Sequence, residues 1–279
     1  SRENASTYGN LVGRDSEGEL NGLVKESLLD RFTAQMELPD VEEMGRLMQK
    51  TQNRLLEKGI TSIQSDDLCS ARPEQHRALL KHIQALCASG KIRLRYSEQL
   101  YVPDLARELE ALTWIPELGK PGDHFHVSAI KIIGDGSLGA RTAHLRQGYR
   151  DDPGNHGIAF YDQPTLDEMV ARAHERGVAV AIHAIGDGAV DSALTAIERA
   201  RLKNPAPVRH GLVHCQITDR ALLSRFAQAG ALAFTQPVFL DYDSHIVRER
   251  VGNELAETSY AFHTYVKMGV CEAFGTDCP

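Results

Sequence analysis

Long apolar runs are absent from this sequence of 279 residues, and no stretch approaches the length that a membrane-spanning helix needs. Massed basic residues are absent too: the formal net charge is −7 at pH 7, and Lys and Arg are scattered along the chain. Proteins that bind nucleic acid or an anionic membrane surface usually show a concentrated basic patch. We therefore expect neither nucleic acid nor a membrane as a partner.

Paired cysteines are also missing. The five cysteines are odd in number and no two form a C-x-x-C motif; they are Cys69, Cys87, Cys215, Cys271 and Cys278. This pattern argues against a disulfide scaffold and against a cysteine-built metal site. We interpret them as thiols in a reducing compartment and expect a cytoplasmic protein. Because the chain opens with Ser1 instead of Met, a removed N-terminal signal is the alternative.

Two regions can be distinguished along the chain. Residues 1–30 are polar and turn-rich, and Gly13 to Gly18 lie between short runs that could pair as a hairpin. Residues 31–279 alternate between helical and β-rich segments, which predicts βαβ units, a parallel sheet and an α/β fold. The helical patterns cover 41–57, 73–89, 165–176, 189–202, 219–229 and 254–268, and the β-rich runs cover 60–64, 92–96, 127–133, 178–184, 208–214, 232–236 and 270–274.

Some helix ends are marked by capping residues. Thr165 stands three residues before Glu168, which is the spacing of a capping box. Asp219 and Gly230 are expected to bound the helix between them.

Polar residues at the ends of apolar strands favour a closed barrel over an open sheet. Lys131, His183, His214 and Asp277 each lie in or just after a different β-rich run. In a (β/α) barrel the reactive side chains come from the carboxyl ends of several strands, whereas an open sheet gathers them at one switch point. The spacing agrees, because an eight-unit barrel uses roughly 31 residues per unit. His183 and His214 are one such unit apart (214 − 183 = 31), and Asp277 follows after two (277 − 214 = 63).

These residue types suit metal-assisted hydrolysis. Neutral imidazoles such as those of His183 and His214 are good ligands for zinc and similar metals. A bound metal lowers the pKa of water and polarises a carbonyl. Asp277 could accept the proton of that water and pass it to a leaving nitrogen. A single histidine at a strand end is more often a structural polar group than a ligand, and Asp277 alone could be a turn residue before Pro279. The joint pattern across several strand ends is what favours the metal site.

Lys131 requires a separate interpretation. A protonated amine has no lone pair for a cation, and burial without a partner is costly. Pairing with an acid such as Asp135 is one explanation. The functional alternative is carbamylation by CO2, which turns the amine into an anionic oxygen ligand.

Five short motifs occur in order along the chain. They are Lys131-Ile-Ile-Gly-Asp-Gly-Ser-Leu-Gly-Ala-Arg141, Asp152-Pro-Gly-Asn-His-Gly157, His183-Ala-Ile-Gly-Asp187, Arg209-His210 with His214-Cys-Gln216, and Gly275-Thr-Asp-Cys-Pro279. In this order they closely resemble the amidohydrolase superfamily. The nearest branch is similar to amidohydrolase family 3, which includes N-substituted formamide deformylase and exoenzyme regulatory proteins. The similarity covers essentially the whole chain and is densest from His126 onward.

The resemblance implies roles for four residues. Lys131 would be a carbamylated ligand, His183 and His214 would be metal ligands, and Asp277 would be the ligand that activates water. The implied cofactor is a divalent metal, zinc in the first place, with one or two ions in intact members and one or none here. Arg141 and His156 lie in the long excursion between Gly134 and Pro164 and are candidate substrate-binding residues, or else members of a surface ion pair.

The sequence departs from the family at both ends. No His-x-His strand precedes Ile60, and neither part of the family's β-sandwich is present. We therefore expect an incomplete TIM-type (β/α) barrel over residues 31–279, with strands two to eight. Open sheet edges favour pairing with another chain or with the N-terminal hairpin, and the first of these predicts a homo-oligomer.

The predicted function is metal-dependent hydrolysis of amide-type C–N bonds in a small molecule, with Asp277 as base. One alternative is an inactive barrel fragment. Another is a nucleotide-dependent oxidoreductase, because Gly134-x-Gly136-x-x-Gly139 follows a strand and matches a dinucleotide-binding fingerprint. That alternative requires a helix to begin at this loop.

Overall fold

The computed structural model describes residues 11–24, 28, 37–66, 68 and 71–278. The chain divides into two compact units, Ser1–Pro39 and Asp40–Pro279. In the first unit, β1 (Val12–Arg14) and β2 (Leu20–Val24) pair in antiparallel fashion. The carboxylate of Asp15 accepts backbone N–H groups from Glu17 and Glu19, which holds the turn between the two strands.

The second unit is built on one sheet of seven parallel strands. The strands neighbour one another in chain order: β3 (Ser62–Ser65), β4 (Arg95–Tyr101), β5 (Phe125–Ile133), β6 (Ala179–Ala184), β7 (Gly211–His214), β8 (Leu232–Thr235) and β9 (Cys271–Phe274). Helices connect them, so this is the incomplete (β/α) barrel expected from the sequence. Within the described residues, β3 and β9 each pair on one side only.

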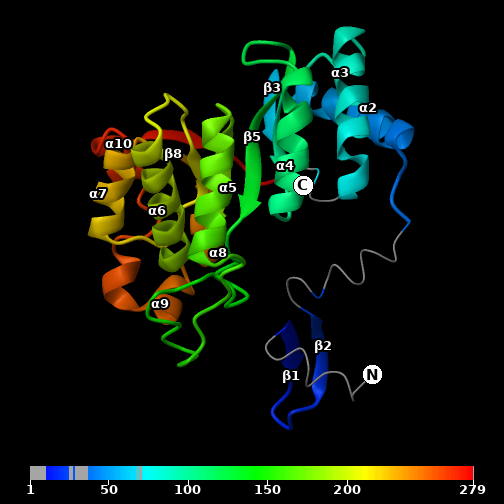
Figure 1. Cartoon of the computed structure of the whole chain (residues 1–279). Coiled ribbons are helices and arrows are strands. Elements are labelled where there is room, and N and C mark those ends of the chain that lie inside the picture. The colour runs from blue at the N-terminus through cyan, green and yellow to red at the C-terminus, as the bar shows by residue number, and fades with distance from the viewer. Residues whose placement is uncertain (1–10, 25–27, 29–36, 67, 69–70, 279) are drawn as a thin grey trace. The chain divides into compact units, whose positions relative to one another are not determined.

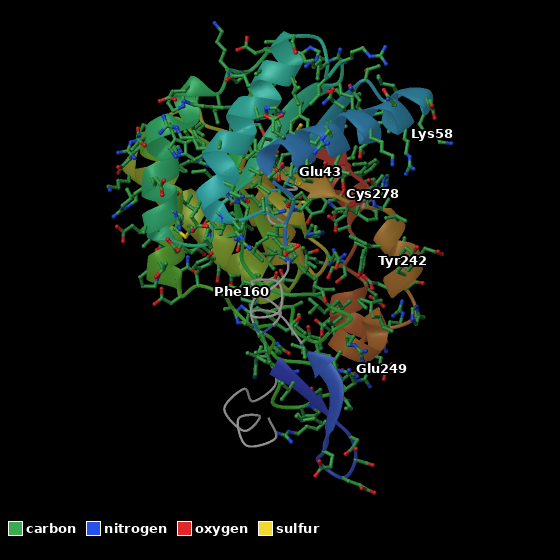
Figure 2. All side chains as sticks on the ribbon, turned by 90° about the vertical axis from the view of Figure 1, so that its right-hand side faces the viewer. Glu43, Lys58, Phe160, Tyr242, Glu249 and Cys278 are labelled. Carbon is green, nitrogen blue, oxygen red and sulfur yellow. The ribbon has the colours of Figure 1, made fainter. Side chains whose placement is uncertain are left out.

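Helices cover the outer side of the sheet (Figure 1). The helices of this unit are α2 (Val41–Glu57), α3 (His76–Ala88, preceded by the short η4, Pro73–Gln75), α4 (Leu105–Trp114, followed by η5, Ile115–Glu117), α5 (Gln163–Glu175), α6 (Asp187–Lys203), α7 (Arg220–Ala229), α8 (Val238–Asp243), α9 (Val247–Ala256) and α10 (Phe262–Lys267). The excursion after β5 and helix α9 lie at the end of the sheet to which the β5 arrow points. Tyr242 on α8 and Glu249 on α9 project from the surface (Figure 2). None of the helices in the described residues is both long and apolar enough to cross a bilayer.

Alternation along the strands divides the apolar residues between two faces. Residues such as Ile130, Ile182 and Leu212 are fully buried in the main core, between the sheet and the helices. The opposite, inner face has a smaller cluster made of Ala129, Ala181 and Val213. Because successive side chains of a strand point to opposite faces, every second residue after Ala129 and Ala181 also faces inward.

Aspartates begin several of the helices. The side chains of Asp40, Asp104, Asp162 and Asp219 each accept a backbone N–H from the first turn of the helix that follows. Asp219 was the predicted cap, and Gly230 ends the same helix in the left-handed conformation, as expected. The capping box predicted at Thr165 is wrong: α5 begins at Gln163 and is capped by Asp162, whose carboxylate binds the N–H of Thr165.

Two other predictions differ from the structure, and one of the alternative interpretations is excluded. The helix predicted over 254–268 is instead α9 and α10, because Tyr260 has φ of 50° and donates its N–H to Gln216 O, away from the helix. The strand predicted at 92–96 begins at Arg95 and runs to Tyr101. No helix begins at Gly134 to Gly139, since the next helix is α5, so the dinucleotide-binding interpretation is wrong.

Candidate metal centre

His183 occupies the inner face of the sheet near the carboxyl end of β6. It lies two residues after Ala181, and its Cα partner across the sheet is Ile133 of β5. Lys131 of β5 faces Ala181 in the same register, so Lys131 and His183 stand on the same face of neighbouring strands. Two of the predicted site residues are therefore placed together by strand geometry alone.

His214 reaches this face through an unusual backbone. It is the last residue of β7 and follows Val213, which faces inward, so regular alternation would point it outward with Leu212. Its φ is 77° and that of Cys215 is 50°, both in the region that favours glycine. The His214 ring nevertheless lies edge-on to that of His183, with centroids 4.4 Å apart. Two successive non-glycine residues in this conformation hold a strained turn, which is common at functional sites.

The hydrogen bonds of both rings fix their tautomers. His183 Nε2 lies 3.1 Å from the carbonyl oxygen of Gly136, which can only accept, so Nε2 has the proton and Nδ1 the lone pair. His214 Nδ1 lies 2.9 Å from Gln236 Oε1. The amide of Gln236 is oriented by its own donation to Phe234 O, so His214 Nδ1 is the donor and Nε2 has the lone pair. Each imidazole thus keeps one nitrogen free for a ligand.

His214 is held in the neutral state. Burial lowers the pKa of His214 well below its usual value, and the neighbouring His183 and Lys131 act in the same direction. A neutral imidazole with one anchored nitrogen is the form that binds zinc and similar cations. The two histidines therefore fit a divalent metal ion.

Lys131 is paired, but not with the acid that the sequence suggested. Its ammonium lies 2.5 Å from Asp66 Oδ2, and only 6% of its side chain is exposed. Asp66 directly follows β3, two strands away. Asp135 is instead fully buried beside His183, where it accepts the backbone N–H groups of Ile185, Gly186 and His144. The pairing of Lys131 with Asp135 was wrong.

Asp277 lies three residues after the end of β9 (277 − 274 = 3), exposed and with φ of 53°. Over the part of the chain that the structure describes, no three His, Cys, Asp or Glu side chains come close enough to hold a metal ion. The structure thus brings His183, His214 and Lys131 together and leaves Asp277 outside this group.

The two predicted substrate-binding residues make contacts of their own. The guanidinium of Arg141 donates to Asp151 Oδ2 at 2.7 Å, and Arg250 of α9 donates to the same oxygen. His156 Nδ1 lies 3.2 Å from Leu145 O. Both contacts connect parts of the excursion to each other or to α9.

Comparisons with known proteins identify the family of this chain. The model described as the amidohydrolase family, in its family 3 branch, matches residues 2–279. The chain belongs to the amidohydrolase family. One relative is YtcJ of Bacillus subtilis (strain 168), whose name describes it as an amidohydrolase. It is 30% identical to this chain, over 100% of this chain and 51% of its own length.

Two solved structures share the fold of this chain. A metal-dependent hydrolase from Pyrococcus furiosus superposes with a TM-score of 0.72 at 27% identity, over 95% of this chain and 53% of its own. A second one, from Pyrococcus horikoshii OT3, gives 0.72 at 26%, over 98% and 53%. The amidohydrolase chain described here spans about half the length of these relatives.

Three further residues of this amidohydrolase chain contact the candidate ligands and were not predicted in those roles. Asp66 binds Lys131, Asp135 lies 3.3 Å from His183 Nε2, and Gln236 binds His214. Asp66 and Gln236 each directly follow a strand, which is the signal that could have identified them.

Proposed function

We propose that this chain provides most of the metal centre of a divalent-metal-dependent hydrolase acting on amide-type C–N bonds of a small molecule. One observation supports this above the others: the imidazoles of His183 and His214 lie in contact, and each has one nitrogen anchored and one free. A fortuitous pair of structural histidines would have no need for the strained turn at His214.

The proposed metal ligands are His183 Nδ1 and His214 Nε2, with zinc as the ion that best suits imidazole. A divalent ion held there would lower the pKa of water and polarise the carbonyl of the substrate. Lys131 would join as a carbamate. The ammonium of Lys131 would first lose one proton and with it the ion pair to Asp66. The neutral amine nitrogen would then form a bond to the carbon of CO2 and lose a second proton to solvent, which leaves an anionic carbamate.

Asp277 is proposed as the proton carrier. Its carboxylate would take a proton from the attacking water and deliver it to the departing nitrogen. Its exposure and its place beyond the end of β9 leave it free to turn toward the sheet end. Arg141 is proposed to hold a substrate carboxylate, which would require the guanidinium to release Asp151.

The test combines metal content with turnover. The whole chain is loaded with Zn²⁺, dialysed and analysed for bound metal, and hydrolysis is measured on a panel of N-acyl and N-formyl amides. His183→Ala and His214→Ala should each abolish stoichiometric zinc. His126→Ala is the matched control, since His126 is a half-buried histidine in β5, away from the paired rings. It should retain zinc.

Asp277→Asn separates binding from chemistry. Asparagine tolerates a positive φ as well as aspartate does, so the backbone is not disturbed. Zinc should remain bound and turnover should fall by about 100-fold or more. Full zinc content in the His183→Ala/His214→Ala double variant would refute the metal site. Bound zinc without turnover on any amide would instead favour an inactive barrel.

A further inference from the structure

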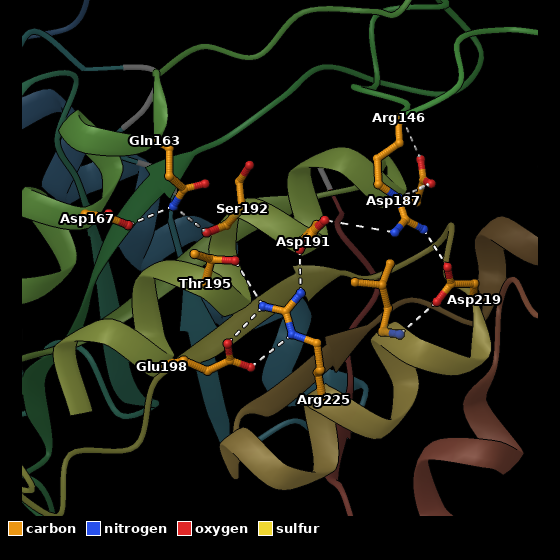
Figure 3. Close-up of polar contacts among 11 residues, drawn as sticks. Arg146, Gln163, Asp167, Asp187, Asp191, Ser192, Thr195, Glu198, Asp219 and Arg225 are labelled. Atoms are coloured by element: carbon orange, nitrogen blue, oxygen red, sulfur yellow. Dashed lines mark hydrogen bonds and ion pairs between the residues drawn. The ribbon is translucent and has the colours of Figure 1, made fainter. Parts of the chain in front are cut away.

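Arg146 joins the two helices that follow the histidine strands. It lies in the excursion between β5 and α5, and its Nε donates to Asp187 Oδ2 at 2.7 Å (Figure 3). Its Nη2 donates to Asp219 Oδ2 at 2.6 Å, and its backbone N–H donates to Asp187 Oδ1 at 3.1 Å. One side chain therefore connects α6 to α7.

The two carboxylates stand close to the histidines in sequence. Asp187 is the first residue of α6, four positions after His183 (187 − 183 = 4). Asp219 caps α7, five positions after His214 (219 − 214 = 5), and its other oxygen still accepts the N–H of Leu222. A displacement of either helix start would be transmitted through a few residues of backbone to an imidazole.

The excursion that bears Arg146 is locked to the same turn by backbone contacts. Gly188 donates its N–H to His144 O at 2.9 Å. A Cβ at Gly186 would lie only 2.1 Å from that oxygen, so the two backbones approach each other more closely than any side chain permits. Asp135 adds its three backbone bonds here. Arg146 extends this rigid block from the His183 side to the His214 side.

Arg225 provides a comparison, because it belongs to the same group of ion-paired side chains (Figure 3). It also joins α7 to α6, through Asp191, Glu198 and Thr195, but touches neither Asp187 nor Asp219. Its contacts lie further along α6, beyond the first turn. The two arginines share Asp191, whose Oδ2 lies 3.9 Å from Arg146 Nη1, and they differ because Arg146 alone of the two reaches Asp187 and Asp219.

We propose that Arg146 is a positioning residue that sets the separation of the His183 and His214 imidazoles and so tunes the affinity of this site for a divalent cation. The link to cation binding rests on the proposed function. The effect on the rings does not, and it can be measured on the metal-free protein. Arg146 itself binds no metal, because a guanidinium has no lone pair to offer.

The first arm of the test is independent of metal. In the metal-free full chain with labelled histidines, the parent should show strong NOEs between the two rings, whose centroids are 4.4 Å apart. Arg146→Gln should weaken or abolish these NOEs, and Arg225→Gln should leave them unchanged. The lysine of Arg146→Lys can reach only one of the two carboxylates, so its NOE intensities should lie between those of Arg146→Gln and the parent. If Arg146→Gln does not fold, Arg146→Lys takes its place in the comparison.

The second arm measures Co²⁺ binding by its visible absorption spectrum. Loss of a residue that orients metal ligands typically weakens binding by about 10- to 100-fold. Arg146→Gln should show this loss of Co²⁺ affinity together with an altered spectrum. The Co²⁺ affinity of Arg225→Gln should stay within about threefold of that of the parent. Both results should hold whether or not either substitution lowers the melting temperature. Unchanged NOEs in Arg146→Gln would overturn the proposal. Failure of the parent to bind Co²⁺ while its NOEs respond to Arg146→Gln would refute the proposed function but leave the positioning role.

Discussion

The ammonium of Lys131 lies 2.5 Å from the carboxylate of Asp66, although the two residues are separated by the whole width of β4. Lys131 is almost completely buried, whereas Asp66 is about one third exposed. The pair links the residue that follows β3 to β5, across the intervening strand β4. It also gives the buried ammonium of Lys131 a counter-charge.

We predict that Asp66→Asn lowers the free energy of unfolding by about 1–3 kcal/mol, because it leaves a buried ammonium without its counter-charge. Adding Lys131→Met should restore most of that loss, since the charge is then removed. Urea denaturation followed by circular dichroism measures both. Glu175→Gln is the control: it breaks the exposed pair with Lys203, which solvent screens, and should leave the free energy of unfolding almost unchanged. An Asp66→Asn variant as stable as the parent would contradict this.

Two histidines at the opposite end of the strands form a second buried pair. The N–H of Val180 donates to His210 Nδ1, so His210 Nε2 donates to His174 Nδ1 at 2.8 Å, and His174 Nε2 donates to Asn204 O. This chain of bonds requires both rings to be neutral. Burial lowers the pKa of His210 to about 3, with His174 and Arg201 acting in the same direction.

Acid should therefore destabilise the protein through His210. Between about pH 3 and pH 6.5, which are the pKa of His210 in the folded chain and its ordinary value, His210 is protonated in the unfolded chain but neutral in the folded chain. The contribution of His210 to the free energy of unfolding is therefore fully present above pH 6.5. Below that pH it falls by up to about 1.4 kcal/mol per pH unit. His210→Gln should give a flatter profile in urea denaturation between pH 7 and pH 4. His124→Gln, at an exposed histidine, should keep the slope of the parent; equal slopes for both variants would count against the assignment.

Glu108 lowers the stability of the fold as the pH rises, whereas His210 lowers it as the pH falls. It is fully buried on α4, and neither carboxylate oxygen has a hydrogen-bond partner among the described residues. Burial raises its pKa to about 8. An acid whose folded pKa is raised destabilises the fold as the pH rises from 4.5 toward 8, because the charged form is favoured only in the unfolded chain.

Glu108→Met should accordingly stabilise the protein more at pH 8 than at pH 5. The substituted side chain is of similar length and has no charge to bury. Melting temperatures at the two pH values give the comparison. Glu110→Met changes an exposed residue of the same helix, and it should shift the melting temperature by a similarly small amount at pH 5 and at pH 8. A Glu108→Met variant that gains nothing at pH 8 would show that the carboxyl has a partner.

The repeating parts of the fold were predictable because they depend on local pattern. The helix expected at 41–57 has those bounds in the structure, where Asp40 begins it. The apolar run predicted at 178–182 lies in β6 from Ala179 onward, and β6 is an interior strand of the sheet. His183 and Lys131 were placed correctly because strand alternation is sufficient to bring them to one face.

The rest depends on contacts between distant segments. The partner of Lys131 is 65 positions away (131 − 66 = 65), and Asp135, four positions from it, was the natural but wrong choice. The direction of His214 follows from a backbone conformation that no residue type at 214 or 215 announces. The helix predicted over 254–268 failed for a similar reason, since the bond from Tyr260 to Gln216 is made across the fold.

The left-handed turn at His214 and Cys215 also has a bearing on protein engineering. Each such residue is disfavoured by about 1–3 kcal/mol relative to glycine in the same conformation. Variants ranked by melting temperature alone would tend to accumulate glycine or asparagine at these positions and to erase the imidazole. Any thermostabilisation of this chain should therefore be scored on cation affinity as well as on resistance to heat.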